Sequence, residues 1–487
     1  MLRFIIISSM LLCLVACRVN QEAPASTDVA TASVTQHLFS VKDFGAVGDG
    51  HTNDTEAIQL AVDQIVAAGG GSLIFPAGNY LSGMVELGSN LEIILQAGCI
   101  WQAIPEAELY PDLQFSTADL SQSEGFTMTR KAFIIGRNIE NFSLRGPGQI
   151  HPQGERHDAF PAHESNGAKR PYGIYLIDSK QIRISNIELR NSAFWMLRLY
   201  RCDDVQLNGI RIWNHANTNN DGIDIVDCHR VTVSDCVIDS SDDALCLKSE
   251  APRGCRDIVI TNCLISSTAS YLKLGTASFG SFEGITISNC VLRTTRAREI
   301  IHGLQIPQGI TGLAVMSADG AKIANVSFNN IVMEGLSCPI FVRLGNRHRY
   351  THQEYADLPI TPGEVKNLSF SNITASGVGA LPIVIAGYPG HPVEGVRLNN
   401  VVIDATRAGK PSDLSPVEEN DRGYPSPLMW GTNLPAAGLF VRYANDVHLR
   451  DVFWTSAGED PRPAIYAEEA DLNLAGVYFN GSLVEER

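Results

Sequence analysis

Apolar and polar residues alternate in a short phrase that returns many times along the chain. The phrase has the form apolar-x-apolar-x-polar-apolar, with Asn, Asp or once Gly at the fifth position. Its copies begin at Ile182, Val205, Val231, Ile258, Ile285, Val326, Leu368, Val396 and Val447. Each copy predicts a β-strand with one buried face. Most starts are 23 to 28 residues apart, and the longer intervals of 41, 42 and 51 residues indicate inserted loops or two coils together.

This repeat predicts a solenoid of stacked coils. A lone strand of this kind cannot bury its inward side chains, whereas parallel stacking buries a continuous core and pairs the backbone amides of neighbouring coils. An antiparallel sandwich also has many short strands, but it does not predict the same phrase at near-constant intervals. We therefore expect an all-β fold of the parallel β-helix type.

The segment before the repeats has the features of a cap. It reads FSVKDFGAVGDGHTNDTEA over residues 39–57, then an amphipathic stretch IQLAVDQIVAA, then GGGSLIFPAGNYL. It resembles the N-terminal capping segment of the pectate-lyase-like β-helix superfamily. The resemblance implies a right-handed, single-stranded parallel β-helix with a capping helix over its open end. Hydrolases, lyases, tailspikes and epimerases share such caps, so the chemistry stays open.

The first residues predict export. A short basic start is followed by the apolar run 4–12 and by Leu14-Val15-Ala16-Cys17, a small-residue cleavage site. These four residues resemble a bacterial lipoprotein box with the lipid on Cys17; the alternative is an ordinary signal peptide. We expect a lipoprotein signal peptide over residues 1–17, a flexible tether over 18–37 and the β-helix domain over 38–487. Arg18 fits outer-membrane sorting in this resemblance, on either the periplasmic face or the cell surface.

Composition limits the partners. The chain has 53 acidic and 37 basic residues, a formal net charge of -16, which argues against a nucleic-acid partner. Membrane contact is expected through the lipid anchor alone, and the protein is expected to be a monomer. Cys236, Cys263 and Cys290 share one phase of consecutive coils and predict a buried thiol stack. A Cys246–Cys255 disulfide and free thiols both stay open. The cysteine and histidine spacings predict neither a metal site nor a cofactor.

Three aspartates in consecutive coils are the candidate catalytic residues. Aligning Ile223 with Leu245 stacks Asp221 over Asp243, with Asp242 one residue earlier. Adjacent parallel strands lie about 4.8 Å apart, so the three carboxyls would share one small patch. At least one pKa should then rise. A protonated carboxyl beside ionised ones is what glycosidic cleavage requires.

Aspartates at β-helix turns also have a structural interpretation, because they hydrogen-bond the backbone. We assign Asp224 and Asp239 to that class. Neighbours on a regular strand point to opposite faces, so Asp242 and Asp243 converge only if the strand breaks at residues 240–241.

Around these aspartates the chain resembles glycoside hydrolase family 28, the polygalacturonase family. The phrases AFWMLRLYRCDDVQL, NNDGID and the DD pair support the resemblance, which runs from about residue 39 to at least 343. It implies an inverting mechanism with Asp242 as the general acid. Asp221 and Asp243 would hold and deprotonate the water, and Asn219 would hydrogen-bond the sugar or its carboxylate.

Two family motifs are changed in this chain. The family's Gly-His-Gly falls at residues 269–271, where Ser270 takes the place of the histidine. The family's Arg-Ile-Lys falls near residues 314–316, which read Ala-Val-Met. Charge-assisted contacts to a substrate carboxylate are strong, so their loss disfavours plain homogalacturonan.

Other residues could compensate for these changes. Lys273 either replaces part of the lost positive charge or is a solvated lysine. Arg343 and Arg442 each end an apolar strand and either line a sugar subsite or are ordinary surface arginines. The insertion over residues 405–437, with Tyr424 and Trp430, either forms an aromatic wall beside the site or packs against the solenoid.

The sequence therefore predicts an exported, inverting, exo-acting O-glycosyl hydrolase for pectin-type or related acidic polysaccharides and oligosaccharides. One alternative is a β-helix polysaccharide lyase or epimerase with a Ca²⁺-binding carboxylate set and Lys273 as base. The other is a non-catalytic, surface-anchored glycan-binding protein.

Overall fold

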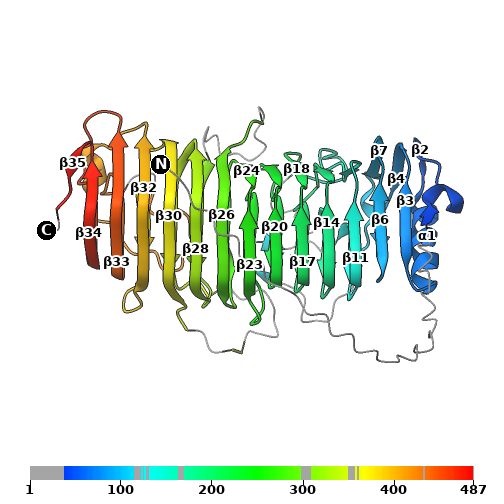
Figure 1. Ribbon diagram of the computed structural model, residues 1–487, viewed down its shortest axis with the longest axis horizontal. Helices are drawn as coiled ribbons and strands as arrows, with labels where there is room; N and C mark the ends of the chain where they lie inside the picture. The colour runs from blue at the N-terminus through cyan, green and yellow to red at the C-terminus, as the bar shows by residue number, and fades with distance from the viewer. Residues whose placement is uncertain are drawn as a thin grey trace, which may run out of the picture. The chain divides into compact units, whose positions relative to one another are not determined.

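The chain forms a parallel β-helix. The computed structural model describes residues 38–113, 122–123, 126–127, 131–162, 169–297, 309–348, 357–358, 361–431 and 434–485. Within them the coils build one continuous 33-stranded sheet (Figure 1). The predicted all-β, right-handed parallel β-helix is confirmed. The signal peptide, the lipid anchor at Cys17 and the tether predicted over residues 1–37 lie outside the described residues.

Each regular coil has three strands, one on each of three faces. Face A contains β5 (Val85–Glu86), β10 (Ala132–Arg137), β13 (Tyr172–Ile177), β16 (Leu197–Tyr200), β19 (Ile223–Val226), β22 (Leu245–Ser249), β25 (Ser270–Ser278), β27 (Gly309–Ser317), β29 (Leu336–Leu344) and β31 (Ile383–Ala386). Face B contains β1 (Leu38–Ser40), β3 (Gly71–Phe75), β6 (Leu91–Leu95), β11 (Glu140–Arg145), β14 (Lys180–Ser185), β17 (Asp203–Asn208), β20 (His229–Ser234) and β23 (Cys255–Thr261). Face C contains β2 (Asp49–Asn53), β4 (Gly78–Ser82), β7 (Cys99–Ala103), β12 (Gln149–His151), β15 (Glu188–Arg190), β18 (Arg211–Asn214), β21 (Val237–Ser240) and β24 (Leu264–Ser267).

Later strands are longer and cross from one face to the next. Faces B and C are shared by β26 (Phe282–Thr294), β28 (Lys322–Glu334), β30 (Glu364–Val378) and β32 (Val393–Ala405). The last coils are formed by β33 (Leu439–Ser456) and β34 (Ile465–Phe479). A short antiparallel strand, β35 (Ser482–Leu483), pairs with β34, and β8 (Gln122–Ser123) and β9 (Phe126–Thr127) form a separate hairpin.

The repeated phrase is the strand of face B. Its first residues pair in one unbroken ladder from Ile182 through to Val447. In every copy, from Asn186 in the first to Asp451 in the last, the fifth residue has a left-handed backbone with φ between 50° and 65°. Asn, Asp and Gly tolerate this conformation best, which explains their place in the phrase.

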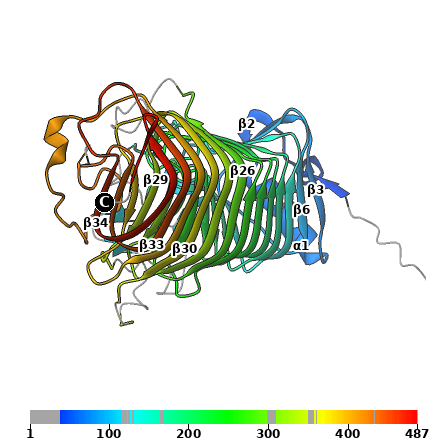
Figure 2. The same cartoon turned by 60° about the vertical axis from the view of Figure 1, so that its left-hand side comes forward.

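The long intervals are single coils with insertions. Ile285 pairs directly with Val326, and Val396 pairs directly with Val447. The last of these insertions, residues 406–438 between β32 and β33, contains a short 3-10 helix over Pro411–Leu414. Figure 2 shows this orange segment outside the nested coils, on the side of β29.

The capping helix is confirmed. Helix α1 (Thr55–Ala67) buries Ile58, Ala61, Val62 and Ile65, the apolar face of its amphipathic stretch. It lies at the N-terminal end of the coils, next to β3 (Figure 1). Within the described ranges, no helix is long and apolar enough to cross a membrane.

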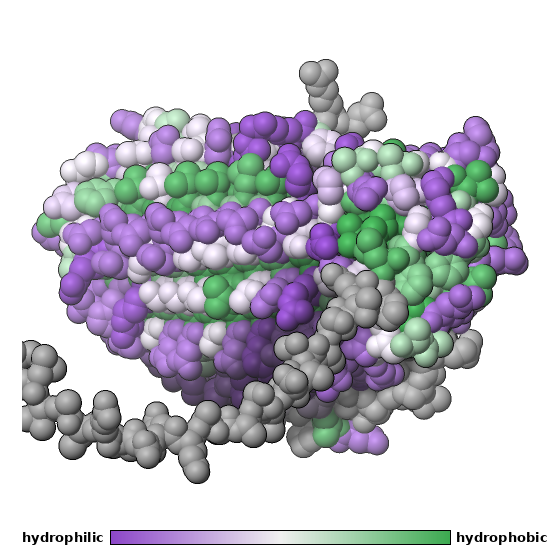
Figure 3. Space-filling model, turned by 45° about the vertical axis from the view of Figure 1, so that its right-hand side comes forward, coloured by the Kyte–Doolittle hydropathy of each residue, from purple (hydrophilic) through white to green (hydrophobic). Residues whose placement is uncertain are grey.

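Equivalent side chains stack along the solenoid, so the surface shows bands of hydrophobic and hydrophilic residues (Figure 3). The predicted thiol stack is present, with Cys236, Cys263 and Cys290 buried on consecutive coils. Cys246 and Cys255 are both free thiols, so the structure does not contain the disulfide left open above.

Candidate active site

The strand that precedes Asp242 and Asp243 ends before them, which is the break that their convergence requires. Strand β21 ends at Ser240 and β22 begins at Leu245, so Asp242 and Asp243 lie in the turn between faces C and A. The Ser240 hydroxyl donates to the Asp242 carbonyl at 2.8 Å, and the Ser267 hydroxyl of the next coil donates to the same carbonyl at 2.5 Å. These bonds fix a turn in which neighbouring side chains need not alternate between faces.

Asp221 and Asp243 occupy equivalent positions on adjacent coils. Ile223 pairs with Leu245, two residues after each aspartate, and the Gly222 amide donates to the Asp243 carbonyl at 3.0 Å. Burial is the main cause of the raised pKa of Asp221, and the charges of Asp242 and Asp243 raise it further. The structure therefore brings together the three predicted carboxylates, Asp221, Asp242 and Asp243.

A lysine that the sequence interpretation missed joins two carboxylates. Lys248 on β22 places its Nζ 2.8 Å from Asp221 Oδ2 and also contacts Asp224 Oδ1. The Nζ lies 3.5 Å from the centre of the Trp195 ring. Asp224 is wrongly assigned to a turn above, because it lies within β19 and is fully buried. The available signal was a lysine after the apolar run LCL of this strand, two residues after Cys246, on the same face as Asp224.

A second lysine holds Asp243. Lys273 on β25 places its Nζ 2.5 Å from Asp243 Oδ2, and the Ser270 amide donates to Asp243 Oδ1 at 3.3 Å. Lys273 is 4% exposed, so it is not the solvated lysine of the second interpretation. Ser270, at the position of the family's histidine, is buried and reaches Asp243 through its backbone.

Burial and charge determine the protonation of the cluster formed by Asp221, Asp224, Asp242, Asp243, Lys248 and Lys273. Burial raises the pKa of Asp221 well above its usual value, Lys248 opposes this, and Asp224 adds to it. Burial also raises the pKa of Asp224 to about 6, against the effect of Lys248. Burial disfavours the charged form of Lys248. The negative charges of Asp221 and Asp224 have the larger combined effect, so the pKa of Lys248 is raised. The raised pKa values of Asp221 and Asp224 therefore favour a retained proton in this cluster.

A metal fits this cluster poorly. Ligand atoms of Asp221, Asp224 and Cys246 lie within 4.8 Å of one another. The Lys248 ammonium already contacts both carboxylates, so a divalent cation would have to displace it. Burial also raises the pKa of the Cys246 thiol, which disfavours the thiolate that a metal requires.

Asn219 lies near Asp221 but has a protein partner. Its Oδ1 accepts a hydrogen bond from Nη2 of the buried Arg170 at 2.9 Å, and its backbone is left-handed with φ 54°. It is half-buried. The structure thus places Asn219 at the edge of the cluster, oriented by Arg170.

Arg343 does not line an open subsite. Arg343 on β29 and Arg442 on β33 are buried, and both pair with Glu419 of the insertion. Their guanidinium carbons lie 5.2 and 5.3 Å from the centre of the Trp430 ring. The expected sugar contact of Arg343 is therefore replaced by a contact that holds the insertion on face A. Because both arginines are buried, the alternative interpretation as ordinary surface arginines is also wrong.

Asp239 also differs from its expected place at a turn. It lies in β21 on face C, where its Oδ1 is 2.9 Å from His215 Nε2.

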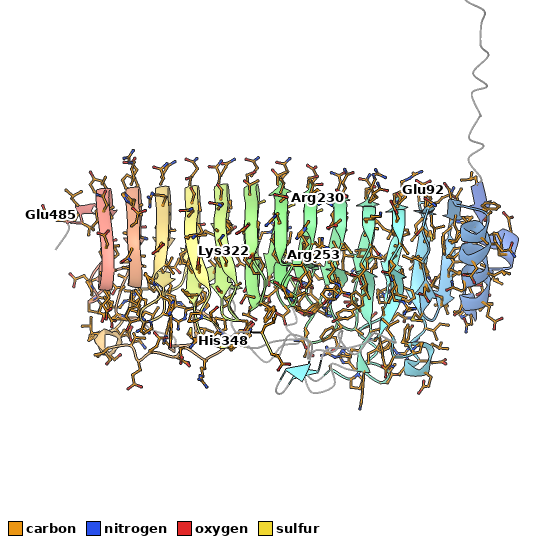
Figure 4. The ribbon with its side chains drawn as sticks, turned by 90° about the horizontal axis from the view of Figure 1, so that it is seen from below. Glu92, Arg230, Arg253, Lys322, His348 and Glu485 are labelled. Carbon is orange, nitrogen blue, oxygen red and sulfur yellow. The ribbon has the colours of Figure 1, made fainter. Side chains whose placement is uncertain are left out.

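Face B has ion pairs of its own. Arg230 pairs there with Asp204 of the preceding coil, with an Nε–Oδ1 distance of 2.7 Å. Figure 4 shows Arg230 on the opposite side of the coils from His348, which follows β29 of face A. These face B ion pairs therefore lie away from the carboxylate cluster.

Two apolar clusters border the charged one on the outer surface of face A. The cluster toward the N-terminus comprises Leu113, Ala132, Ile135, Tyr172, Tyr175, Ile177, Phe194, Trp195, Tyr200 and Val226. The cluster toward the C-terminus comprises Ala314, Met316, Cys338, Phe341, Leu381, Val384, Ala386, Leu434, Ala436 and Phe440, with residues of the insertion packed on it. The cluster of aspartates and lysines therefore lies between two apolar clusters along face A.

Three aspartates on adjacent coils of a parallel β-helix, one of them with a raised pKa, form the kind of carboxylate set that glycosidic cleavage uses. The sequence matches the profile of glycosyl hydrolases family 28 over residues 75–419. The chain therefore belongs to glycoside hydrolase family 28.

Similar proteins agree with this membership. A probable polygalacturonase of Vitis vinifera is 30% identical over 231 residues, which are 46% of each chain. The match thus spans about half the length of that relative. A polygalacturonase of Chamaecyparis obtusa is 24% identical and is aligned over 80% of this chain and 70% of its own. The solved structure of the Yersinia enterocolitica family 28 exopolygalacturonase superimposes with a TM-score of 0.67 at 20% identity, covering 90% of this chain and 78% of that one.

Proposed function

We propose that the protein is an exported, inverting exo-hydrolase of pectin-type or related acidic oligosaccharides and polysaccharides. The observation that supports it most directly is the position of Asp221, Asp242 and Asp243 on adjacent coils, in the turns that lead into face A. Inverting enzymes need one carboxyl to protonate the leaving oxygen and an ionised partner to activate water.

The surroundings of the three aspartates suggest their separate roles. Asp242 is the half-buried member, whereas Asp221 and Asp243 are buried. A general acid must reach the glycosidic oxygen of the substrate, which favours Asp242. Asp221 and Asp243 each contact the ammonium group of a buried lysine, which fixes their orientation and suits groups that hold and deprotonate water. Asp221 must lose its proton for this step, so activity should rise with pH through its raised pKa.

The substrate class follows from the charges that remain. Ala314 and Met316, where the family's Arg and Lys are expected, are buried beneath the insertion. A substrate carboxylate therefore has to bind elsewhere, and Lys273 and Lys248 are the cations nearest the aspartates. The insertion over residues 406–438 covers the outer surface of the later coils. Coverage of the later coils favours release from a chain end, as does the similarity to an exopolygalacturonase.

We also propose that Cys17 carries a lipid that anchors the protein to the outer membrane. This rests on the sequence of residues 14–17 after the apolar run 4–12. In the native host, Cys17→Ser should move the protein from the membrane fraction to the soluble fraction. Membrane retention of the Ser variant would reject the anchor while leaving the hydrolase proposal intact.

Hydrolysis of a panel of pectic and algal oligosaccharides tests the activity. A hydrolase should release reducing sugar from the chain end without any product that absorbs in the ultraviolet, and it should be unaffected by EDTA. An unsaturated product or loss of activity in EDTA would support the lyase or epimerase instead. Glycan binding without turnover, unchanged in Asp242→Asn, would support the glycan-binding protein.

A further inference from the structure

Tyr424 connects the insertion to the carboxylate cluster. Its hydroxyl accepts a hydrogen bond from Lys273 Nζ at 3.2 Å, and that Nζ lies 2.5 Å from Asp243 Oδ2. The same Nζ lies 5.7 Å from the centre of the Tyr424 ring. Tyr424 is 56% exposed although Lys273 and Asp243 are buried. A large aromatic ring is therefore accessible directly beside a proposed catalytic carboxylate.

The position of Tyr424 is fixed from both sides of the chain. Five residues before it, Glu419 contacts Arg343 and Arg442. Three residues before Tyr424, the backbone carbonyl of Asp421 accepts a hydrogen bond from the backbone amide of Asn346 at 2.9 Å. After it, Trp430 packs against both arginines. The exposed ring thus belongs to a segment that is held on face A at several points.

We propose that Tyr424 is a specificity-determining residue of this site, whose ring contacts a uronic-acid sugar bound beside Asp243. Its hydroxyl orients the Lys273 ammonium and makes Lys273 a positioning residue for Asp243. The inference rests on the proposed function, since it names the sugar class that the same site receives. Aromatic rings bind the apolar faces of sugars, and the neighbouring ammonium attracts a carboxylate.

The ring and the hydroxyl have separable effects. Loss of the ring removes a binding contact, which should raise KM. Loss of the hydroxyl alone leaves the ring in place but releases one partner of the Lys273 ammonium, which should lower kcat because Asp243 is held less well. A residue with a merely structural role would not divide its effects between KM and kcat in this way.

Tyr424→Ala and Tyr424→Phe separate these effects with trigalacturonate as the probe. Tyr424→Ala should raise KM about tenfold, in line with the loss of one aromatic contact. Tyr424→Phe should lower kcat roughly three- to tenfold, in line with one lost hydrogen bond, with little change in KM. Leu414→Ala is the matched control, because Leu414 is 48% exposed on the same insertion. It should behave like the native protein.

Binding measured by calorimetry in the Asp242→Asn background completes the test. Trigalacturonate should bind this variant, and adding Tyr424→Ala should weaken the binding about tenfold. If the native protein cleaves trigalacturonate and both Tyr424 variants match it, this inference fails and the proposed function survives. If the native protein neither cleaves nor binds trigalacturonate, the proposed uronate specificity fails and the Tyr424 contact fails with it. Should Tyr424→Ala not fold, the kcat of Tyr424→Phe decides alone.

Discussion

Lys248 Nζ lies 2.8 Å from Asp221 Oδ2 and joins this carboxylate to the fully buried Asp224. Three charged groups from two neighbouring coils thus share one site away from water. Asp224 raises the pKa of Asp221 and Lys248 lowers it. Burial is the largest cause of the raised pKa of Asp221, and two groups outside the predicted triad adjust it further.

Replacing these two groups should shift the pH dependence in opposite directions. Asp224→Asn removes a negative charge that raises the pKa of Asp221, so the acid limb of kcat/KM should move to lower pH. Lys248→Gln removes a positive charge that lowers it, so the same limb should move to higher pH. The pH profile of kcat/KM on a cleaved oligosaccharide measures both. Shifts in the same direction, or none, would contradict the assignment of this limb to Asp221.

Lys248 should also matter for stability. Lys248→Met leaves the buried carboxylates of Asp221 and Asp224 without their cation, and breaking a buried ion pair in this way costs about 3–5 kcal/mol. Urea unfolding at pH 7 gives the free energy of unfolding. Arg256→Met is the control, since this arginine pairs with Glu283 at the exposed surface and should contribute at most about 1 kcal/mol. Equal losses in the two variants would mean that burial does not govern the Lys248 contact.

Asp242→Asn should abolish cleavage while the fold is retained. The substitution keeps the shape of the side chain and removes the proton that the leaving oxygen needs, a loss of at least about 10²-fold in kcat. Circular dichroism and thermal unfolding should match those of the native protein. Residual activity within tenfold of native would assign the general acid to another residue.

Glu419 should control how firmly the insertion is held. Glu419→Gln removes the negative charge between Arg343 and Arg442 and leaves two buried cations without it. We expect faster limited proteolysis within residues 406–438 and a raised KM, with the coils themselves still folded. Glu418→Gln, next in the chain, should leave both properties unchanged. A Glu419 variant as resistant as the native protein would show that other contacts hold the segment.

Much of the fold could be predicted because each copy of the repeat contains the residues that make a coil form. The left-handed residue after each strand and the buried apolar pairs recur in every copy, so the ladder from Ile182 to Val447 follows from local pattern alone. Stacking of Asp221 over Asp243 follows from the same register.

The partners of these aspartates could not be predicted in the same way. Outward positions on face A are normally solvated, and only the packing of Trp195 and the insertion shows that Lys248 and Lys273 are buried. Arg343 shows the same limit, because its partner Glu419 is 76 residues away in an insertion without a repeat. Sequence pattern defines the register of neighbouring coils, whereas such contacts depend on how long segments fold back over them.

The stereochemistry of the first product tests the central claim most directly. Asp242 as acid, with Asp221 and Asp243 holding water on the opposite face of the sugar, predicts inversion at the anomeric carbon. A proton NMR time course with a cleaved oligosaccharide should show the inverted anomer first, followed by its equilibration. Initial release of the retained anomer would contradict the roles assigned to the three aspartates.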